Sequence, residues 1–212
     1  ILCSGNAVEM PWLPQVPALV QAWYLGSEAG NAIANIVSGE VNPSGKLPFS
    51  FPKKLEDNAA YSYGALSYPG KDNKQEYMED ILVGYRWFDT KKITPQFPFG
   101  YGLSYTTFSY GKPSTDKTEY QANDIIKLTF QLSNTGKTAG AEIVQVYASQ
   151  PKASVLRPVK ELKAFKKVQL NAGETTTVEL KIKTQELAYY NDKTQSWVVE
   201  PGEFILQTAA SS

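Results

Sequence analysis

Strict alternation of apolar and polar residues in the second half of the chain is the feature that most limits its fold. In residues 126–132, Ile126, Leu128, Phe130 and Leu132 stand at every second position between polar residues, and residues 176–182 repeat the pattern. A period of two places every second side chain on the same face of a strand. Both segments are therefore predicted to be strands with one buried face.

Turn-forming residues separate these strands from further apolar runs. Asn134-Thr135-Gly136, Asn171-Ala172-Gly173 and Pro201-Gly202 are typical turn chemistry. Strands are predicted near residues 107–110, 124–133, 141–149, 159–168, 174–184 and 203–209. Short strands without a helix between them favour a β-sandwich of fibronectin type III or immunoglobulin type, which usually has about seven strands. We expect this sandwich to occupy residues 106–212 and to lack its last strand.

Residues 1–50 have a pattern typical of an α/β layer. Residues 1–3 and 18–24 are short apolar runs that predict strands, and residues 28–37 have apolar side chains at helical spacing. Ser27 is predicted to cap the start of the helix and Gly39 to end it. Two strands and one helix cannot close a core by themselves, so the segment is predicted to be an incomplete parallel-sheet layer.

Residues 51–105 combine many aromatic side chains with turn formers such as Tyr68-Pro69-Gly70. A flexible linker would instead be rich in glycine, serine or charged residues. This segment is therefore predicted to be an ordered, aromatic-rich connection packed over a surface. The glycines among the aromatic residues of 99–105 are predicted to permit positive φ or close backbone approach.

Composition excludes several classes of function. The chain has no histidine, which is the commonest metal ligand and general base, so we expect no metal site and no cofactor. Lysine plus arginine and aspartate plus glutamate both number 21, which leaves no single-sign field to attract a polyanion. No apolar stretch approaches the roughly 20 residues that span a bilayer. We therefore expect neither a nucleic-acid nor a membrane partner.

An acidic run and a row of large side chains lie close together in the connection: Glu76, Glu79, Asp80, Tyr85, Arg86 and Trp87. Carboxylates beside aromatic rings occur in glycosidase clefts. A surface acidic run that pairs with Arg86 is the commoner meaning of such a pattern, and an aromatic ring here either stacks on a sugar or anchors the connection. Tyr85, Arg86 and Trp87 are accordingly the candidate substrate-binding residues, at the border of a cleft.

Ordered motifs along nearly the whole chain resemble glycoside hydrolase family 3. The motifs are SGNAVEMPW at 4–12, AWYLGSEAGNA at 22–32, VNPSGKLP at 41–48, VGYRWFD at 83–89, FPFGYGLSYTTF at 97–108, RPVKELKAF at 157–165 and NAGET at 171–175. Each is weak alone, but their common order is a specific signal. The chain resembles the C-terminal portion of such an enzyme, with the end of the α/β second domain followed by a fibronectin III-like domain.

This resemblance implies a retaining, exo-acting β-glycosidase. A β-glucosidase is the first expectation and a β-xylosidase the second, acting on terminal non-reducing β-linked sugars of oligosaccharides or on aryl β-glycosides. In the family an aspartate of an N-terminal barrel is the nucleophile and a glutamate of the second domain is the acid/base. Both are expected before Ile1, so no catalytic residue is predicted here and the isolated chain is predicted to be inactive.

The resemblance also implies partners and a location. The chain is expected to brace the barrel and the rest of the second domain within the full-length enzyme, which is expected to be periplasmic or secreted. An oligomer, the sugar and the linkage stay open. Two alternatives also stay open: a purely structural spacer, and a carbohydrate-binding or adhesion module of fibronectin III type, which would carry an exposed aromatic platform.

Overall fold

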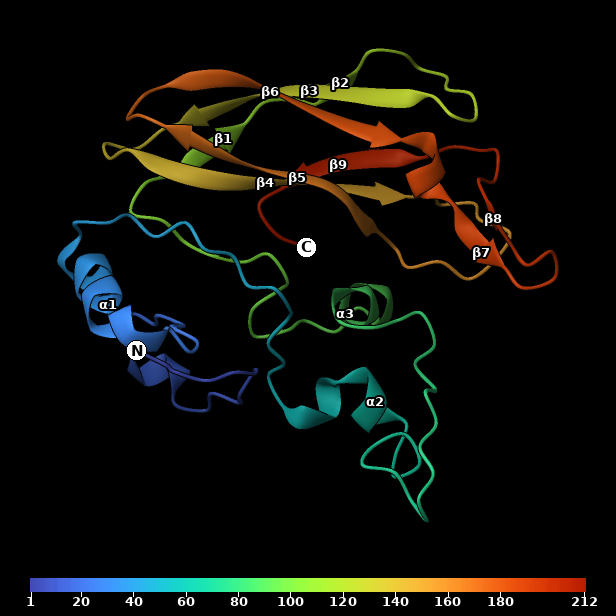
Figure 1. Ribbon diagram of the computed structural model, residues 1–212, viewed down its shortest axis with the longest axis horizontal. Helices are drawn as coiled ribbons and strands as arrows, with labels where there is room; N and C mark the ends of the chain where they lie inside the picture. The colour runs from blue at the N-terminus through green and yellow to red at the C-terminus, as the bar shows by residue number, and fades with distance from the viewer. The chain divides into compact units, whose positions relative to one another are not determined.

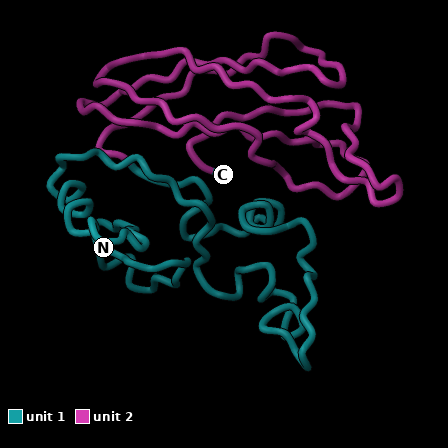
Figure 2. The backbone as a smooth tube through the Cα atoms, in the orientation of Figure 1, with its two compact units in different colours: residues 1–103, 212 teal, residues 104–211 magenta.

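The computed structural model describes all of residues 1–212 and divides into two compact units. Unit 1 comprises residues 1–103 with Ser212, and unit 2 comprises residues 104–211 (Figure 2). No helix in either unit is both long and apolar enough to cross a membrane.

Unit 2 contains two larger antiparallel sheets, which Figure 1 shows face to face. In the first sheet, β3 (Ile125–Asn134) pairs with β1 (Phe108–Tyr110), β2 (Ser114–Thr115) and β6 (Thr175–Lys183). In the second, β4 (Gly140–Ser149) lies between β5 (Glu161–Leu170) and β9 (Ile205–Ala209). A separate hairpin joins β7 (Tyr189–Asn191) to β8 (Ser196–Val198), and a 3-10 turn, η4 (Thr184–Leu187), precedes it.

The core of unit 2 follows the alternation seen in the sequence. Leu132 and Ile182 are 0% exposed, and Leu128 pairs with Leu180 across β3 and β6. Val144 and Val146 of β4 join the same buried cluster. The predicted sandwich fold is confirmed, and each predicted strand is present. The strands that sequence reasoning missed, β2, β7 and β8, are two or three residues long, which is too short for a period to be visible.

One ionisable pair lies inside this sandwich. Glu142 of β4 is only 5% exposed, and the Tyr110 hydroxyl donates a hydrogen bond to its Oε1 at 2.9 Å. Burial, reinforced by the neighbouring Glu142 carboxylate, raises the pKa of Tyr110 well above its ordinary value. A buried carboxylate needs such a donor because its lone pairs have lost water.

Unit 1 has few regular elements. Its helices are α1 (Ala29–Ser38), α2 (Ala59–Ser62) and α3 (Tyr85–Lys91), and its 3-10 turns are η1 (Leu13–Gln15), η2 (Gly26–Glu28) and η3 (Leu55–Asp57). The predicted helix is confirmed as α1, and Gly39 ends it with φ 82°. The predicted cap at Ser27 is wrong. Ser27 lies within η2, which runs directly into the helix, so the Ala29 amide donates to the Gly26 carbonyl and no side chain caps the start.

The two strands predicted near the start of the chain are reduced to one parallel bridge. Leu2 and Gln21 form this bridge, in which the Leu2 amide donates to the Val20 carbonyl and the Ala22 amide to the Leu2 carbonyl, each at 2.8 Å. The parallel direction agrees with the predicted layer. The two segments therefore run parallel, as in the predicted sheet, but a single bridge is too short to form strands.

Aromatic rings hold unit 1 together where sheets are lacking. Trp23, Phe49, Phe51, Phe97 and Tyr101 form a chain of ring contacts with centroids 5.3–6.3 Å apart. Phe51 is 1% exposed, and its backbone pairs with that of Phe97. Rings at such separations attract one another in addition to burying apolar area.

Glycine also permits close backbone approach in unit 1, as its position among the aromatic residues predicts. A Cβ at Gly102 would collide with the Gly45 carbonyl oxygen. The Leu47 amide donates to the Tyr101 carbonyl and the Gly100 amide to the Leu47 carbonyl, each at 2.8 Å, so the two motifs at 41–48 and 97–108 are joined by backbone hydrogen bonds. The Lys46 amine adds a hydrogen bond to the Gly102 carbonyl at 3.0 Å.

Candidate functional site

The short helix α3 carries all three candidate substrate-binding residues. Gly84, with φ 61° and ψ −134°, precedes the helix, and Lys92 ends it in the left-handed region. A side chain at Gly84 would be strained in that conformation. Trp87 and Phe88 face inward and form a small buried cluster with Leu82.

Trp87 is committed to contacts within unit 1. Its indole Nε1 donates to the Asp57 carbonyl at 3.0 Å, and its ring lies 5.6 Å from that of Tyr63. The Lys91 ammonium lies 5.3 Å from the centroid of the ring. With 5% of its surface exposed, Trp87 presents no open face for a sugar and acts as an anchor.

Tyr85 and Arg86, at the start of the helix, are half-buried. The ring of Tyr85 stacks on Phe99 with centroids 4.9 Å apart and planes at 25°. The Arg86 guanidinium carbon lies 5.6 Å from the Tyr85 centroid, within the range of a cation–π contact. These contacts hold the guanidinium against an aromatic surface.

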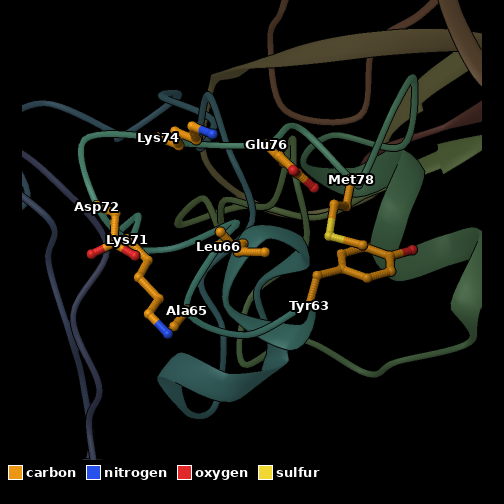
Figure 3. A pocket seen from close by; sticks show the side chains of 8 residues that line it. All are labelled: Tyr63, Ala65, Leu66, Lys71, Asp72, Lys74, Glu76 and Met78. Atoms are coloured by element: carbon orange, nitrogen blue, oxygen red, sulfur yellow. The ribbon is translucent and has the colours of Figure 1, made fainter.

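A hollow of about 660 Å³ opens beside this helix in unit 1 (Figure 3). Its lining residues are Tyr63, Ala65, Leu66, Lys71, Asp72, Lys74, Glu76 and Met78. None of the three predicted residues lines it, but Tyr63 does, and Trp87 packs against Tyr63. Trp87 is thus connected to the hollow through another side chain.

Sequence reasoning placed residues 63–78 in the connection and singled out Glu76 as part of an acidic run, but it did not identify the hollow. The backbone turns there because Asp72 and Asn73 both adopt positive φ, at 53° and 58°, between the paired residues Lys71 and Lys74. Two left-handed residues in succession form the tight hairpin turn that Asn and Asp tolerate best after glycine. The Asp72-Asn73 pair was the sequence signal that could have predicted this turn. The turn places two lysines and a carboxylate around one side of the hollow.

Several carboxylates of unit 1 have identifiable surroundings. Glu9 accepts the Leu55 amide at 2.5 Å, and Glu28 accepts the side-chain amide of Asn31 at 2.6 Å. Glu76 lines the hollow, whereas Oε2 of Glu79 is buried without a hydrogen-bond partner.

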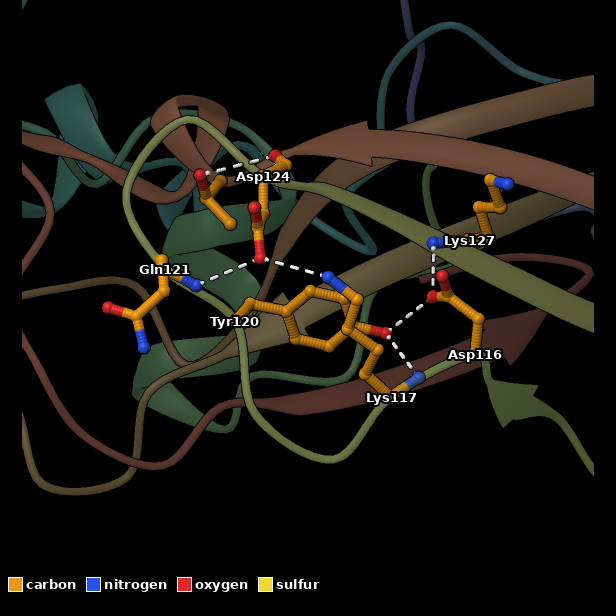
Figure 4. Close-up of polar contacts among 7 residues, drawn as sticks. Asp116, Lys117, Tyr120, Gln121, Asp124 and Lys127 are labelled. Carbon is orange, nitrogen blue, oxygen red and sulfur yellow. Dashed lines mark hydrogen bonds and ion pairs between the residues drawn. The ribbon is translucent and has the colours of Figure 1, made fainter.

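Three carboxyl groups of unit 2, those of Asp116, Asp124 and Glu200, have lowered pKa values. Hydrogen bonds lower the pKa of Asp116, chiefly from the Tyr120 hydroxyl at 2.7 Å, and that of Asp124, chiefly from the Gln121 amide at 3.1 Å (Figure 4). The Ser154 amide likewise lowers the pKa of Glu200. A carboxylic acid that donates protons near neutral pH needs a raised pKa. These three groups instead stabilise loops.

Comparison with known proteins places the chain in a family. Residues 1–105 match the glycosyl hydrolase family 3 C-terminal domain, and residues 142–212 match a fibronectin type III-like domain. The chain belongs to glycosyl hydrolase family 3. The matched family 3 domain includes α3 and the hollow, whereas the fibronectin-like match falls within unit 2 apart from Ser212.

Relatives in family 3 extend over the whole chain. Beta-glucosidase BoGH3A of Bacteroides ovatus is 55% identical over 212 residues, and thermostable beta-glucosidase B of Acetivibrio thermocellus is 48% identical. All of this chain is covered in both alignments, but it spans only 28% of each relative.

Solved structures agree with this family. A β-glucosidase of Kluyveromyces marxianus in complex with glucose has a TM-score of 0.90 and 44% identity, covering 99% of this chain and 24% of its own. The β-glucosidase DesR of Streptomyces venezuelae in complex with D-glucose has a TM-score of 0.89 and 41% identity, covering 98% of this chain and 26% of its own.

Proposed function

We propose that this chain works as part of a retaining, exo-acting β-glucosidase that removes terminal non-reducing β-linked glucose from oligosaccharides or aryl β-glucosides. The observation that carries the proposal is the alignment of the whole chain, at 55% identity, with 28% of the length of a β-glucosidase. β-Xylosides are the second substrate class. The nucleophile and the acid/base of this mechanism belong to the remainder of the enzyme.

The role of the chain in this enzyme is mainly structural. Retaining hydrolysis needs two carboxyl groups about 5 Å apart on either side of the glycosidic bond. Glu9 and Glu28 are engaged in hydrogen bonds within unit 1, to the Leu55 amide and to the Asn31 side chain. Trp87 supports Tyr63 at the wall of the hollow, so α3 stabilises a surface that borders the substrate cleft in this proposal.

The test compares the full-length protein with the 212-residue chain. The full-length protein should hydrolyse 4-nitrophenyl β-glucoside faster than the β-xyloside and release the β-anomer of glucose first, as followed by NMR. The 212-residue chain should show no hydrolysis above that of buffer. Hydrolysis by this chain alone, or initial release of the α-anomer by the full-length protein, would contradict the proposal.

A further inference from the structure

Two exposed aromatic rings stand on the β7–β8 hairpin of unit 2. Tyr190 lies opposite Trp197 in this hairpin, and their rings meet edge to face with centroids 5.6 Å apart and planes at 71°. Trp197 is 72% exposed and Tyr190 is 49% exposed. Tyr189 and Val198, which precede and follow them on the strands, are half-buried. Because side chains alternate across a strand, the ring pair lies on the solvent face of the hairpin.

The size of this ring pair indicates the class of its partner. A stable protein interface buries about 800 Å² on each side, whereas two aromatic side chains bury at most about 500 Å² together. The apolar surface does not continue into the turn, which consists of Asp192, Lys193, Thr194 and Gln195. The ring pair therefore fits one or two small, flat units of a ligand better than a protein surface.

The chemistry of the rings favours a neutral sugar. An aromatic face carries partial negative charge and attracts C–H bonds, and a β-linked glucose unit presents axial C–H bonds on both faces with equatorial hydroxyl groups at its rim. The Tyr190 hydroxyl makes no hydrogen bond within the protein, so it is available to a sugar hydroxyl as donor or acceptor. Asp192 and Lys193 have opposite charges, so the turn favours neither anions nor cations.

We propose that Tyr190 and Trp197 form a binding subsite for a neutral β-linked glucan chain. Trp197 stacks on the face of one glucose unit, and Tyr190 contacts the same or the next unit through its ring edge and hydroxyl. The choice of glucan rests on the proposed β-glucosidase function. The subsite itself binds polymer without taking part in hydrolysis.

Affinity electrophoresis of the full-length protein tests this subsite. Mixed-linkage barley β-glucan in the gel should retard the wild type, whereas α-linked dextran should not. Trp197→Ala should raise the dissociation constant for β-glucan roughly tenfold, as expected for loss of one stacking ring. Phe165→Ala is the matched control, because Phe165 is an exposed ring of the same unit, 67% exposed on β5, and should leave retardation unchanged.

Several outcomes would overturn the subsite. These are no retardation of the wild type, equal retardation of Trp197→Ala, and equal losses in Trp197→Ala and Phe165→Ala. The fluorescence of Trp197 is the difference between the wild type and Trp197→Phe. If acrylamide does not quench that fluorescence in the full-length protein, other parts of the protein cover the ring and the subsite is refuted. Turnover of 4-nitrophenyl β-glucoside should be unchanged in Trp197→Ala. Absence of that turnover in the wild type would instead refute the enzymatic function, so the two failures are distinguishable.

Discussion

Unit 2 buries its core between two hydrogen-bonded sheets, whereas unit 1 depends on ring contacts, single bridges and short helices. In unit 2, β3 and β6 pair continuously from Ile125 to Ser133 around residues that are almost fully buried. In unit 1, α1 has no buried residue, and Val37 is 64% exposed. Stability is therefore distributed over many positions in unit 2 and concentrated at a few aromatic anchors in unit 1.

The largest effect is expected at the anchor of α3. Trp87→Ala removes a buried ring and its hydrogen bond to Asp57, and should destabilise unit 1 by about 3–5 kcal/mol. Hydrogen exchange in the full-length protein should accelerate in residues 55–63 and 84–92 and stay slow in β3 and β6. Trp12→Ala, at a ring that is 36% exposed, is the control and should change exchange little. Unchanged exchange together with unchanged hydrolysis would refute the supporting role of α3.

A core substitution in unit 2 should give a comparable but slightly smaller loss. Leu132→Ala leaves a cavity at a 0% exposed position and should lower the free energy of unfolding of unit 2 by about 2–5 kcal/mol. Val37→Ala, on the exposed face of α1, should change stability by less than about 0.5 kcal/mol. Urea denaturation measures both. Similar losses of unfolding free energy in Leu132→Ala and Val37→Ala would contradict the contrast between the sheet core of unit 2 and the exposed helix α1 of unit 1.

Loss of the hydrogen bond between Tyr110 and Glu142 should have an intermediate effect on the stability of unit 2. Tyr110→Phe deprives a buried carboxylate of a donor and should destabilise unit 2 by about 1–3 kcal/mol. The folded-state pKa of Tyr110 is raised, so its contribution is complete below the unfolded pKa near 10 and declines as pH rises above that value. Urea midpoints from pH 8 to 11 should therefore fall more steeply in the wild type than in Tyr110→Phe. Parallel curves would contradict this assignment.

The smallest effect is expected at the exposed loop of Figure 4. Asp116 accepts hydrogen bonds from the Tyr120 hydroxyl and the Lys127 amide, and its pKa is lowered in the folded state. This contribution is present above the ordinary pKa of aspartate and is lost as pH falls through the folded-state value. Asp116→Asn should lower the urea midpoint slightly at pH 7, and the difference should shrink at pH 3. A difference that grows at low pH would show that the sign is wrong.

Sequence reasoning performed differently in the two units for a physical reason. In unit 2, burial of one face imposes a period of two over nine or ten residues of β3 and β6, so these strands were predictable, and β4 was predictable as an apolar run between turns. In unit 1, only the helix that ends at Gly39 carried a comparable signal. The bridge at Leu2 and the ring chain around Phe51 depend on residues distant in sequence, which no local pattern reveals.

The candidate site shows the same limit. Large side chains beside an acidic run selected the residues of α3, and the structure shows that Trp87 is an anchor whose neighbour Tyr63 lines the hollow. That link joins residues 24 positions apart through side-chain packing. The exposure of Trp197 was equally invisible in sequence, because an aromatic residue in a strand usually predicts a buried face.

The pairing of β9 with β4 also determines when unit 2 can be completed during synthesis. Gln145 lies beside Ala209, 64 residues further along the chain, so the central strand of this sheet waits for a segment that is synthesised much later. Until then, one edge of β4 has no partner in its own sheet and is open to pairing with other chains. Folding of this unit should be slow for its size, since contacts so distant in sequence form late, and nascent chains that stall before residue 205 should bind chaperones.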